Sequence, residues 1–352
     1  MKILISDSIK KNIIYLISLL SLNTTVLSPA NATNEEKILN VYTARHYSSD
    51  KKIYKIFKQE TGIKVREVSS KDQALLERLK SEGSASPADV IILADAARLW
   101  RAEKSGFFQQ HGSAKMTEIV PKKFQSKNNW VGLTSRARVI VVNKRRHGSK
   151  KIATYSDLAS SAFKNQFCSR SSTHPYMLSL VSSVMINLGE KQTKKWAKKI
   201  VSNQARTPRG GDTDQIRAVA SGECGVAVTN SYYLVRLMRS SNPKDRAAVK
   251  KIKVIFPNQN SSGTHINVTG GGIAKHAPHP NNARLFLEFL LSDKIQRLYA
   301  IGNNEWPIVK GTRINNSKLE SLGNFKRDIL SMKEIGKNQF NAQKLLDNVG
   351  WQ

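Results

Sequence analysis

The chain has 352 residues, enough for two domains of ordinary size, and 39% of them are hydrophobic, which excludes a largely disordered protein. Its 57 Lys and Arg residues against 26 acidic residues give a formal net charge of +31, which favours anionic partners. The charges are dispersed along the chain, and no zinc-finger or RNP-like pattern is present, so we expect a basic solvated surface and no nucleic-acid binding.

The first 32 residues have the three parts of a secretory signal peptide. Lys2, Lys10 and Lys11 give a positive start, the stretch 12–22 is mostly apolar, and Ala30-Asn31-Ala32 offers small residues at the cleavage positions. The apolar stretch is too short for an ordinary transmembrane helix. The pattern therefore predicts export of a soluble protein to the periplasm, with an uncleaved membrane anchor as the alternative.

The first part of the mature chain alternates short apolar runs with helical periodicity. Strands are predicted at Ile38–Thr43, Ile63–Val68 and Asp89–Leu93, with one helix after Ser48 or Ser49 and another over Lys71–Glu82. This alternation is typical of a parallel sheet with helices between its strands.

A long strand over Ser135–Asn143 leads into a second α/β pattern. The predicted strands are 225–229, 252–256 and 264–269, and the predicted helices are 178–188, 193–202, 212–221, 281–291, 293–301 and 326–346. The simplest architecture is two α/β lobes, each with its own sheet, with the chain crossing at Ser135–Asn143 and returning at Thr264–Thr269. A ligand cleft would lie between the lobes and close by hinge motion; a single large sheet is the alternative.

Polar aromatic residues follow two predicted strands, at the edge where open α/β sheets bind ligands. Arg45-His46-Tyr47 follows the first strand, and Tyr232-Tyr233 follows the apolar run 225–230. Tyr and His without Cys form a hard oxygen and nitrogen ligand set, which suits a highly charged metal ion. On an extended segment the adjacent side chains of Tyr232 and Tyr233 would point opposite ways. Ordinary packing is the alternative for each pair.

Three further features bear on the site. Tyr176 follows a Ser-rich segment just before a predicted helix, where it could instead be an N-terminal packing residue. Arg136 and Arg138 both lie on the crossing strand, and of the two we favour Arg136 as the residue that faces a ligand. Cys168 and Cys224 lie beside predicted strands, and both a disulfide and two buried free thiols are compatible with this.

The sequence contains no GxSxG elbow, P-loop or HExxH motif, so we expect a binding protein and not an enzyme. Several segments resemble the ferric-ion-binding periplasmic proteins of ABC importers, in particular the cyanobacterial FutA-type branch. The resemblance runs from about residue 38 to the end, and the segments that carry it are 40–47, 86–90, 99–101, 135–139, 210–218, 230–233 and 263–267.

The resemblance implies a two-lobed, hinge-closing fold with lobes at 33–136 plus 268–308 and at 137–267 plus 309–352. It also implies a ferric ion held by His46, Tyr47, Tyr176, Tyr232 and Tyr233. Arg136 would lie near the metal and offset negative charge, and Asp95 stands near the carboxylate ligand of other branches.

The implied partners are an inner-membrane ABC permease and its ATPase, and the implied carrier is a monomer. Phenol has a pKa of about 10, so a trivalent cation must displace its proton, and the same ligands would bind Fe²⁺ less strongly. An aromatic cage for an organic cation such as a polyamine is the alternative function. It would need acidic residues in a cleft whose segments are basic.

Overall fold

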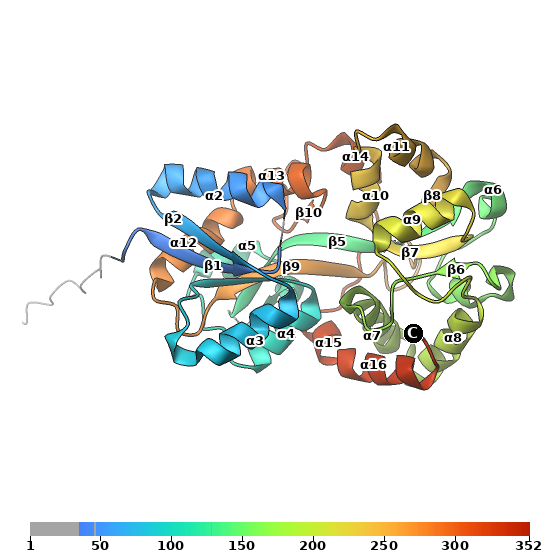
Figure 1. Ribbon diagram of the computed structural model, residues 1–352, viewed down its shortest axis with the longest axis horizontal. Helices are drawn as coiled ribbons and strands as arrows, with labels where there is room; N and C mark the ends of the chain where they lie inside the picture. The colour runs from blue at the N-terminus through green and yellow to red at the C-terminus, as the bar shows by residue number, and fades with distance from the viewer. Residues whose placement is uncertain (1–34, 46, 128) are drawn as a thin grey trace, which may run out of the picture. The chain divides into compact units, whose positions relative to one another are not determined.

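A computed structural model describes residues 35–45, 47–127 and 129–352 (Figure 1). The predicted signal peptide and the candidate ligand His46 lie outside the described residues. Residues Glu36 to Gln352 fold together as one unit. Within the described ranges, no helix combines the length and the apolar character needed to cross a membrane.

The strands of this unit are connected through one long central strand. The strands are β1 (Ile38–Thr43), β2 (Lys64–Ser69), β3 (Val90–Ala94), β4 (Gln125–Ser126), β5 (Trp130–Asn143), β6 (Phe167–Cys168), β7 (Val226–Asn230), β8 (Ile252–Ile255), β9 (Ile266–Ile273) and β10 (Trp306–Pro307). The main path runs β2-β1-β3-β9-β5-β7-β6, and β4, β8 and β10 also pair with β5. The pairs β1–β2, β1–β3 and β6–β7 are parallel, as the alternating pattern predicts.

Strand β5 serves both halves of the unit. It pairs antiparallel with β9 up to Ala137 and with β7 from Arg138 onward. The two crossing segments predicted from the sequence are therefore confirmed as β5 and β9, and they lie side by side. Each half has its own set of strands, as expected, but the two sets are not separate sheets, because β5 pairs with both and joins them.

Helices cover both faces of the sheet. They are α2 (Ser48–Thr61), α3 (Asp72–Glu82), α4 (Ala96–Lys104), α5 (Ala114–Ile119), α6 (Lys144–His147), α7 (Pro175–Leu188), α8 (Glu190–Ser202), α9 (Asp212–Ser221), α10 (Ser231–Met238), α11 (Pro243–Lys250), α12 (Pro280–Leu290), α13 (Asp293–Asn303), α14 (Ser317–Glu320), α15 (Met332–Lys337) and α16 (Gln339–Asn348). Figure 1 shows α2 and α13 on one side of β1 and β2, and α3 and α4 on the other.

Every residue of β5 is buried, because alternate side chains enter two hydrophobic clusters. Val139 and Val141 belong to the larger cluster, whereas Ile140 and Val142 belong to a second cluster with residues of α7, α8 and α16. Near-continuous apolar strands of this kind are expected where a sheet is covered on both faces.

Two local predictions are wrong. The C-terminal segment is not one helix over 326–346. Its first part is not helical, because Arg327 forms a β-bridge with Thr264. Helices begin only at Met332 and Gln339. The tyrosine pair does not lie on an extended segment either, because α10 begins directly after β7.

Candidate metal site

Tyr47 lies at the boundary between β1 and α2. Its backbone is extended and it occupies the N-cap position of α2. The guanidinium of Arg45 lies 4.9 Å from the centroid of its ring. Burial raises the pKa of the Tyr47 phenol, and the nearby Glu305, Tyr176 and Tyr233 raise it further, against the opposing effect of Arg45. The phenol of Tyr47 is therefore influenced electrostatically by tyrosines from the other half of the unit.

Tyr232 and Tyr233 occupy the first turn of α10. Adjacent side chains on a helix diverge by only about 100°, whereas those on a strand point to opposite faces. The two rings consequently stack, with centroids 4.2 Å apart and planes 30° apart. Tyr232 is 2% exposed. Burial first, then Tyr176, Tyr47 and Tyr233, raise the pKa of Tyr232 well above its ordinary value.

Tyr176 is the second residue of α7 and reaches the tyrosine pair. Pro175 opens the helix, and the Nδ1 atom of His174 accepts a hydrogen bond from the backbone N–H of Tyr176 at 3.2 Å. The hydroxyl oxygens of Tyr176 and Tyr232 lie 3.3 Å apart. The structure thus brings Tyr47, Tyr176, Tyr232 and Tyr233 into one cluster, which we call the tyrosine cluster.

Arginine side chains surround the tyrosine cluster. Arg136 is 1% exposed, and its guanidinium lies 5.5 Å from the Tyr176 ring centroid. Its Nη1 donates to Thr269 Oγ1 at 3.2 Å, while its Nε and Nη2 have no hydrogen-bond partner among the described residues. Arg170 lies over the same ring at 5.2 Å. Although burial opposes the charge of Arg136, Tyr176 and Glu305 outweigh it and raise its pKa.

The neighbouring Arg138 has a different environment. Its Nη1 lies 2.7 Å from Asp212 Oδ2 and 3.2 Å from Asn230 Oδ1. Asp212 also accepts from the backbone N–H of Asn230 at 2.7 Å, so this carboxylate fixes the end of β7 directly before α10. Arg138 and Asp212 therefore support the tyrosine pair, whereas Arg136, two residues earlier on β5, lies against Tyr176.

Asp95 is fully committed to hydrogen bonds. Its buried carboxylate accepts from Ser179 Oγ at 2.9 and 2.8 Å, from Asn267 Nδ2 at 2.7 Å and from Gln339 Nε2 at 3.2 Å. It also caps α4 by accepting from the Ala97 N–H. These contacts join β3, β9, α7 and α16, which is the role of a structural carboxylate. Asp95, which the family resemblance places near the carboxylate ligand of other branches, is thus engaged in holding the fold together.

Sequence reasoning missed Glu305, a buried carboxylate in the residues between α13 and β10. Its Oε2 accepts a hydrogen bond from Thr134 Oγ1 at 2.8 Å. The same oxygen lies 3.8 Å from Arg45 Nη1, and Oε1 lies 3.9 Å from Arg136 Nη1. No local motif marks this residue, since every partner comes from a distant part of the chain. The nearest signal in the sequence is an acidic residue directly before the apolar Trp306.

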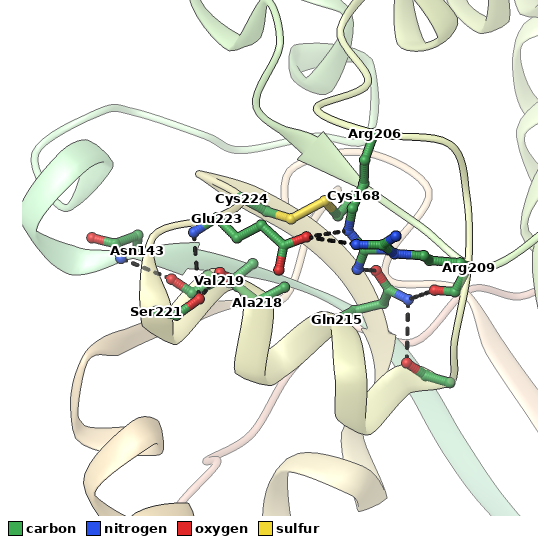
Figure 2. Close-up of a disulfide and its surroundings, with 11 residues drawn as sticks. Asn143, Cys168, Arg206, Arg209, Gln215, Ala218, Val219, Ser221, Glu223 and Cys224 are labelled. Atoms are coloured by element: carbon green, nitrogen blue, oxygen red, sulfur yellow. Dashed lines mark hydrogen bonds and ion pairs between the residues drawn. A yellow bond between two sulfur atoms is a disulfide. The ribbon is translucent and has the colours of Figure 1, made fainter.

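The two cysteines form a disulfide, which answers the question that their positions in the sequence left open (Figure 2). Cys168 is the last residue of β6, and Cys224 lies two residues before β7, so the bridge joins the end of β6 to the segment that enters its parallel neighbour. The chain continues from β6 toward Tyr176 and from β7 toward Tyr232. The disulfide therefore ties together the two segments that supply most of the tyrosine cluster.

Phenolate oxygens are hard, anionic ligands, and several of them together match a small ion of high positive charge. The surrounding guanidinium groups would offset the excess negative charge of such a complex. Among the described residues, no group of three or more His, Cys, Asp or Glu side chains is arranged to hold a metal ion. The tyrosine cluster is thus a different kind of candidate site from a carboxylate or thiolate centre.

Comparison with known proteins agrees with the resemblance seen in the sequence. The profile of the bacterial extracellular solute-binding protein family matches residues 52–318. Iron uptake protein A1 of Synechocystis sp. is 43% identical over 323 residues, which span 92% of this chain and 89% of that protein.

Solved structures give the same result. FutA (IdiA) of Trichodesmium, determined in complex with iron and citrate, is 43% identical with a TM-score of 0.86. The match covers 90% of this chain and 100% of that one. The ferric binding protein of Campylobacter jejuni is 39% identical with a TM-score of 0.83, covering 89% of this chain and 100% of that one. The chain therefore belongs to the bacterial extracellular solute-binding protein family, as a member of its FutA-type group of periplasmic iron-binding proteins with the two-lobed fold.

Proposed function

We propose that this protein binds a ferric ion through the phenolate oxygens of Tyr47, Tyr176, Tyr232 and Tyr233. The observation that carries the proposal is the convergence of these four phenols from three separate segments, with the Tyr176 and Tyr232 hydroxyls 3.3 Å apart. Burial raises the pKa of Tyr47 and Tyr232, so these phenols do not ionise readily without a cation nearby. A bound trivalent cation attracts the phenolate form and makes ionisation favourable. His46 is a fifth candidate ligand on the family resemblance.

The charges in and around the site support a trivalent guest. Four phenolates exceed the charge of Fe³⁺ by one, and the buried Arg136 lies against the cluster to offset that excess. Fe²⁺ would leave a larger negative excess, so we expect it to bind more weakly. A polyamine or another organic cation is a poor match, because Arg45, Arg136 and Arg170 all lie over tyrosines of the cluster and would repel it.

The biological role we infer is that of an iron carrier. The similar proteins named above are described as iron uptake or ferric binding proteins. We propose that this chain, exported to the periplasm, carries Fe³⁺ as a monomer to an inner-membrane ABC permease and its ATPase. The proposed activity is reversible binding and release of the ion, without catalysis.

A ferric titration tests the proposal. Apoprotein titrated with Fe³⁺ supplied as a weak chelate should develop a visible charge-transfer band that saturates at one ion per chain. Tyr232→Phe should lose most of the affinity, because it removes one phenolate oxygen and keeps the aromatic ring. Tyr42→Phe is the matched control, since Tyr42 is buried and bonds Glu82 at 2.8 Å, away from the cluster. A colourless wild-type complex, or equal affinity in the Tyr232→Phe variant, would refute the proposal.

A further inference from the structure

Glu305 connects the two halves of the tyrosine cluster through their arginines. Its carboxylate is buried, with a side chain 2% exposed, and approaches Arg45 Nη1 at 3.8 Å and Arg136 Nη1 at 3.9 Å. Arg45 in turn covers Tyr47 at 4.9 Å, and Arg136 covers Tyr176 at 5.5 Å. One acidic residue is therefore shared by the two cations that lie on candidate ligands from opposite halves of the unit.

The two arginines differ in their other acidic partners. Arg45 is also bound by Asp50, whose oxygens lie 3.1 and 3.2 Å from its Nε and Nη2. Arg136 has Glu305 as its acidic partner within salt-bridge distance among the described residues. The negative charge of Glu305 thus partly cancels the electrostatic effect of Arg136 on the tyrosine cluster.

We propose that Glu305 determines the oxidation-state specificity of the site, by adding a fixed negative charge that disfavours bound Fe²⁺ relative to bound Fe³⁺. This inference rests on the proposed function, because it requires iron in the tyrosine cluster. It does not depend on how many phenols coordinate, since reduction of the bound ion always makes the complex more negative by one unit.

The expected size of the effect follows from Coulomb's law. At an effective dielectric constant of about 20, two unit charges roughly 8 Å apart interact strongly enough to change an equilibrium by more than tenfold. Arg45 and Arg136 neutralise part of the field of Glu305, so about tenfold is the reasonable expectation. Glu305→Gln keeps the volume and can still accept the hydrogen bond from Thr134, but it removes the charge.

The experiment is a spectroelectrochemical titration of the iron-loaded protein, following the charge-transfer band against applied potential. Glu305→Gln should raise the midpoint potential, with about 59 mV corresponding to a tenfold fall in the ratio of the Fe²⁺ to the Fe³⁺ dissociation constant. Anaerobic Fe²⁺ titration should show the same fall in that ratio. Thr134→Val is the control, because it removes the hydrogen bond to Glu305 and keeps the charge, so its potential should stay near that of the wild type.

A second pair of variants covers the case in which Glu305→Gln does not fold because Arg136 has lost its acidic partner. Arg136→Gln/Glu305→Gln removes the pair together, and its potential should exceed that of Arg136→Gln alone. An unchanged or lowered potential on loss of Glu305, or an equal rise in Thr134→Val, would overturn the inference. If wild-type protein binds Fe³⁺ with its visible band and only the potential fails to move, the proposed function stands and the role of Glu305 falls; without wild-type binding, both fail.

Discussion

The hydroxyl oxygens of Tyr176 and Tyr232 lie 3.3 Å apart, although 56 positions separate the two residues in the chain. Cys168 and Cys224 are separated by the same 56 positions, so each tyrosine follows its cysteine at the same spacing. Two parallel strands, β6 and β7, begin this arrangement side by side, and the two helices that follow bring the phenols together. The contact is thus a product of the sheet and its cross-link.

The first prediction concerns the coupling between these two tyrosines. Tyr176→Phe and Tyr232→Phe should each weaken Fe³⁺ binding by more than about 100-fold, which exceeds the usual effect of losing an outer partner of a metal ligand. The double variant should lose less than the product of the single losses, because each ligand acts only while the site is formed. Chelator competition on all four proteins measures this, and strict additivity would argue against a shared metal.

The second prediction is a pH dependence of iron binding. Burial raises the pKa of Tyr47, Tyr176 and Tyr232 above the ordinary value near 10, so all three carry protons in the apoprotein at neutral pH. Fe³⁺ must displace those protons, and binding therefore strengthens as pH rises, by up to about tenfold per pH unit for each proton released.

Chelator competition between about pH 6 and 8, corrected for the known protonation of the chelator, should give this positive slope. Tyr176→Phe should reduce the slope by about one proton, whereas Tyr42→Phe should leave it unchanged. A slope of zero in the wild type would show that phenolates are not the ligands.

The third prediction concerns the disulfide. A cross-link over a 56-residue separation is expected to stabilise the folded chain by about 4 kcal/mol in the chain-entropy description. Cys168→Ser/Cys224→Ser should therefore lower the free energy of unfolding by an amount of that order in denaturant titration. Iron affinity should also fall several-fold, since β6 has only two residues to hold it beside β7.

Glu223→Gln is the matched control for the disulfide variant. Glu223 lies next to the bridge and pairs with Arg206 at 2.8 Å and Arg209 at 3.4 Å (Figure 2). Its side chain is 46% exposed, so losing these pairs should cost less than about 1 kcal/mol and leave iron affinity unchanged. Equal effects of the two changes would mean that the cross-link has no special role.

The fourth prediction separates Asp95 from the metal ligands. Asp95→Asn places an amide donor against the donor groups of Asn267 and Gln339, so it should destabilise the protein by roughly 1–3 kcal/mol. At a temperature where the variant is folded, its charge-transfer spectrum should match that of the wild type. Asp293→Asn is the control. Asp293 forms an exposed ion pair with Arg297, so this change should alter the free energy of unfolding by less than about 0.5 kcal/mol. A shifted spectrum in Asp95→Asn would instead indicate coordination.

Most of the sheet could be predicted from the sequence because its strands are short apolar runs with clear ends. Strand β1 has the predicted bounds Ile38–Thr43, and the strands predicted at Ser135 and Thr264 became β5 and β9. The predicted extended conformation of Tyr232-Tyr233 is wrong, because nothing in the sequence shows that a helix starts directly after Asn230. The apolar residues of α10 fit either extension of the strand or the first turn of a helix.

The environment of the site was harder to predict, because it is built from tertiary contacts. Glu305 meets Arg45 and Arg136 across 260 and 169 positions of sequence, and no spacing rule links such distant residues. The disulfide was equally undetermined, since two cysteines beside strands can be close or far apart. Asp95 carries no sign in the sequence that all of its hydrogen-bonding capacity is taken.

Strand β5 changes partner between Ala137 and Arg138, passing from β9 to β7. A bend at this peptide would carry Tyr47 away with one half of the unit and leave Tyr176, Tyr232 and Tyr233 with the other. In the proposed complex, the three remaining phenolates and one ferric ion would sum to zero charge. Opening would thus change an anionic complex with four phenolates into a neutral complex with three. Release of the ion would then begin with the loss of the Tyr47 phenolate alone.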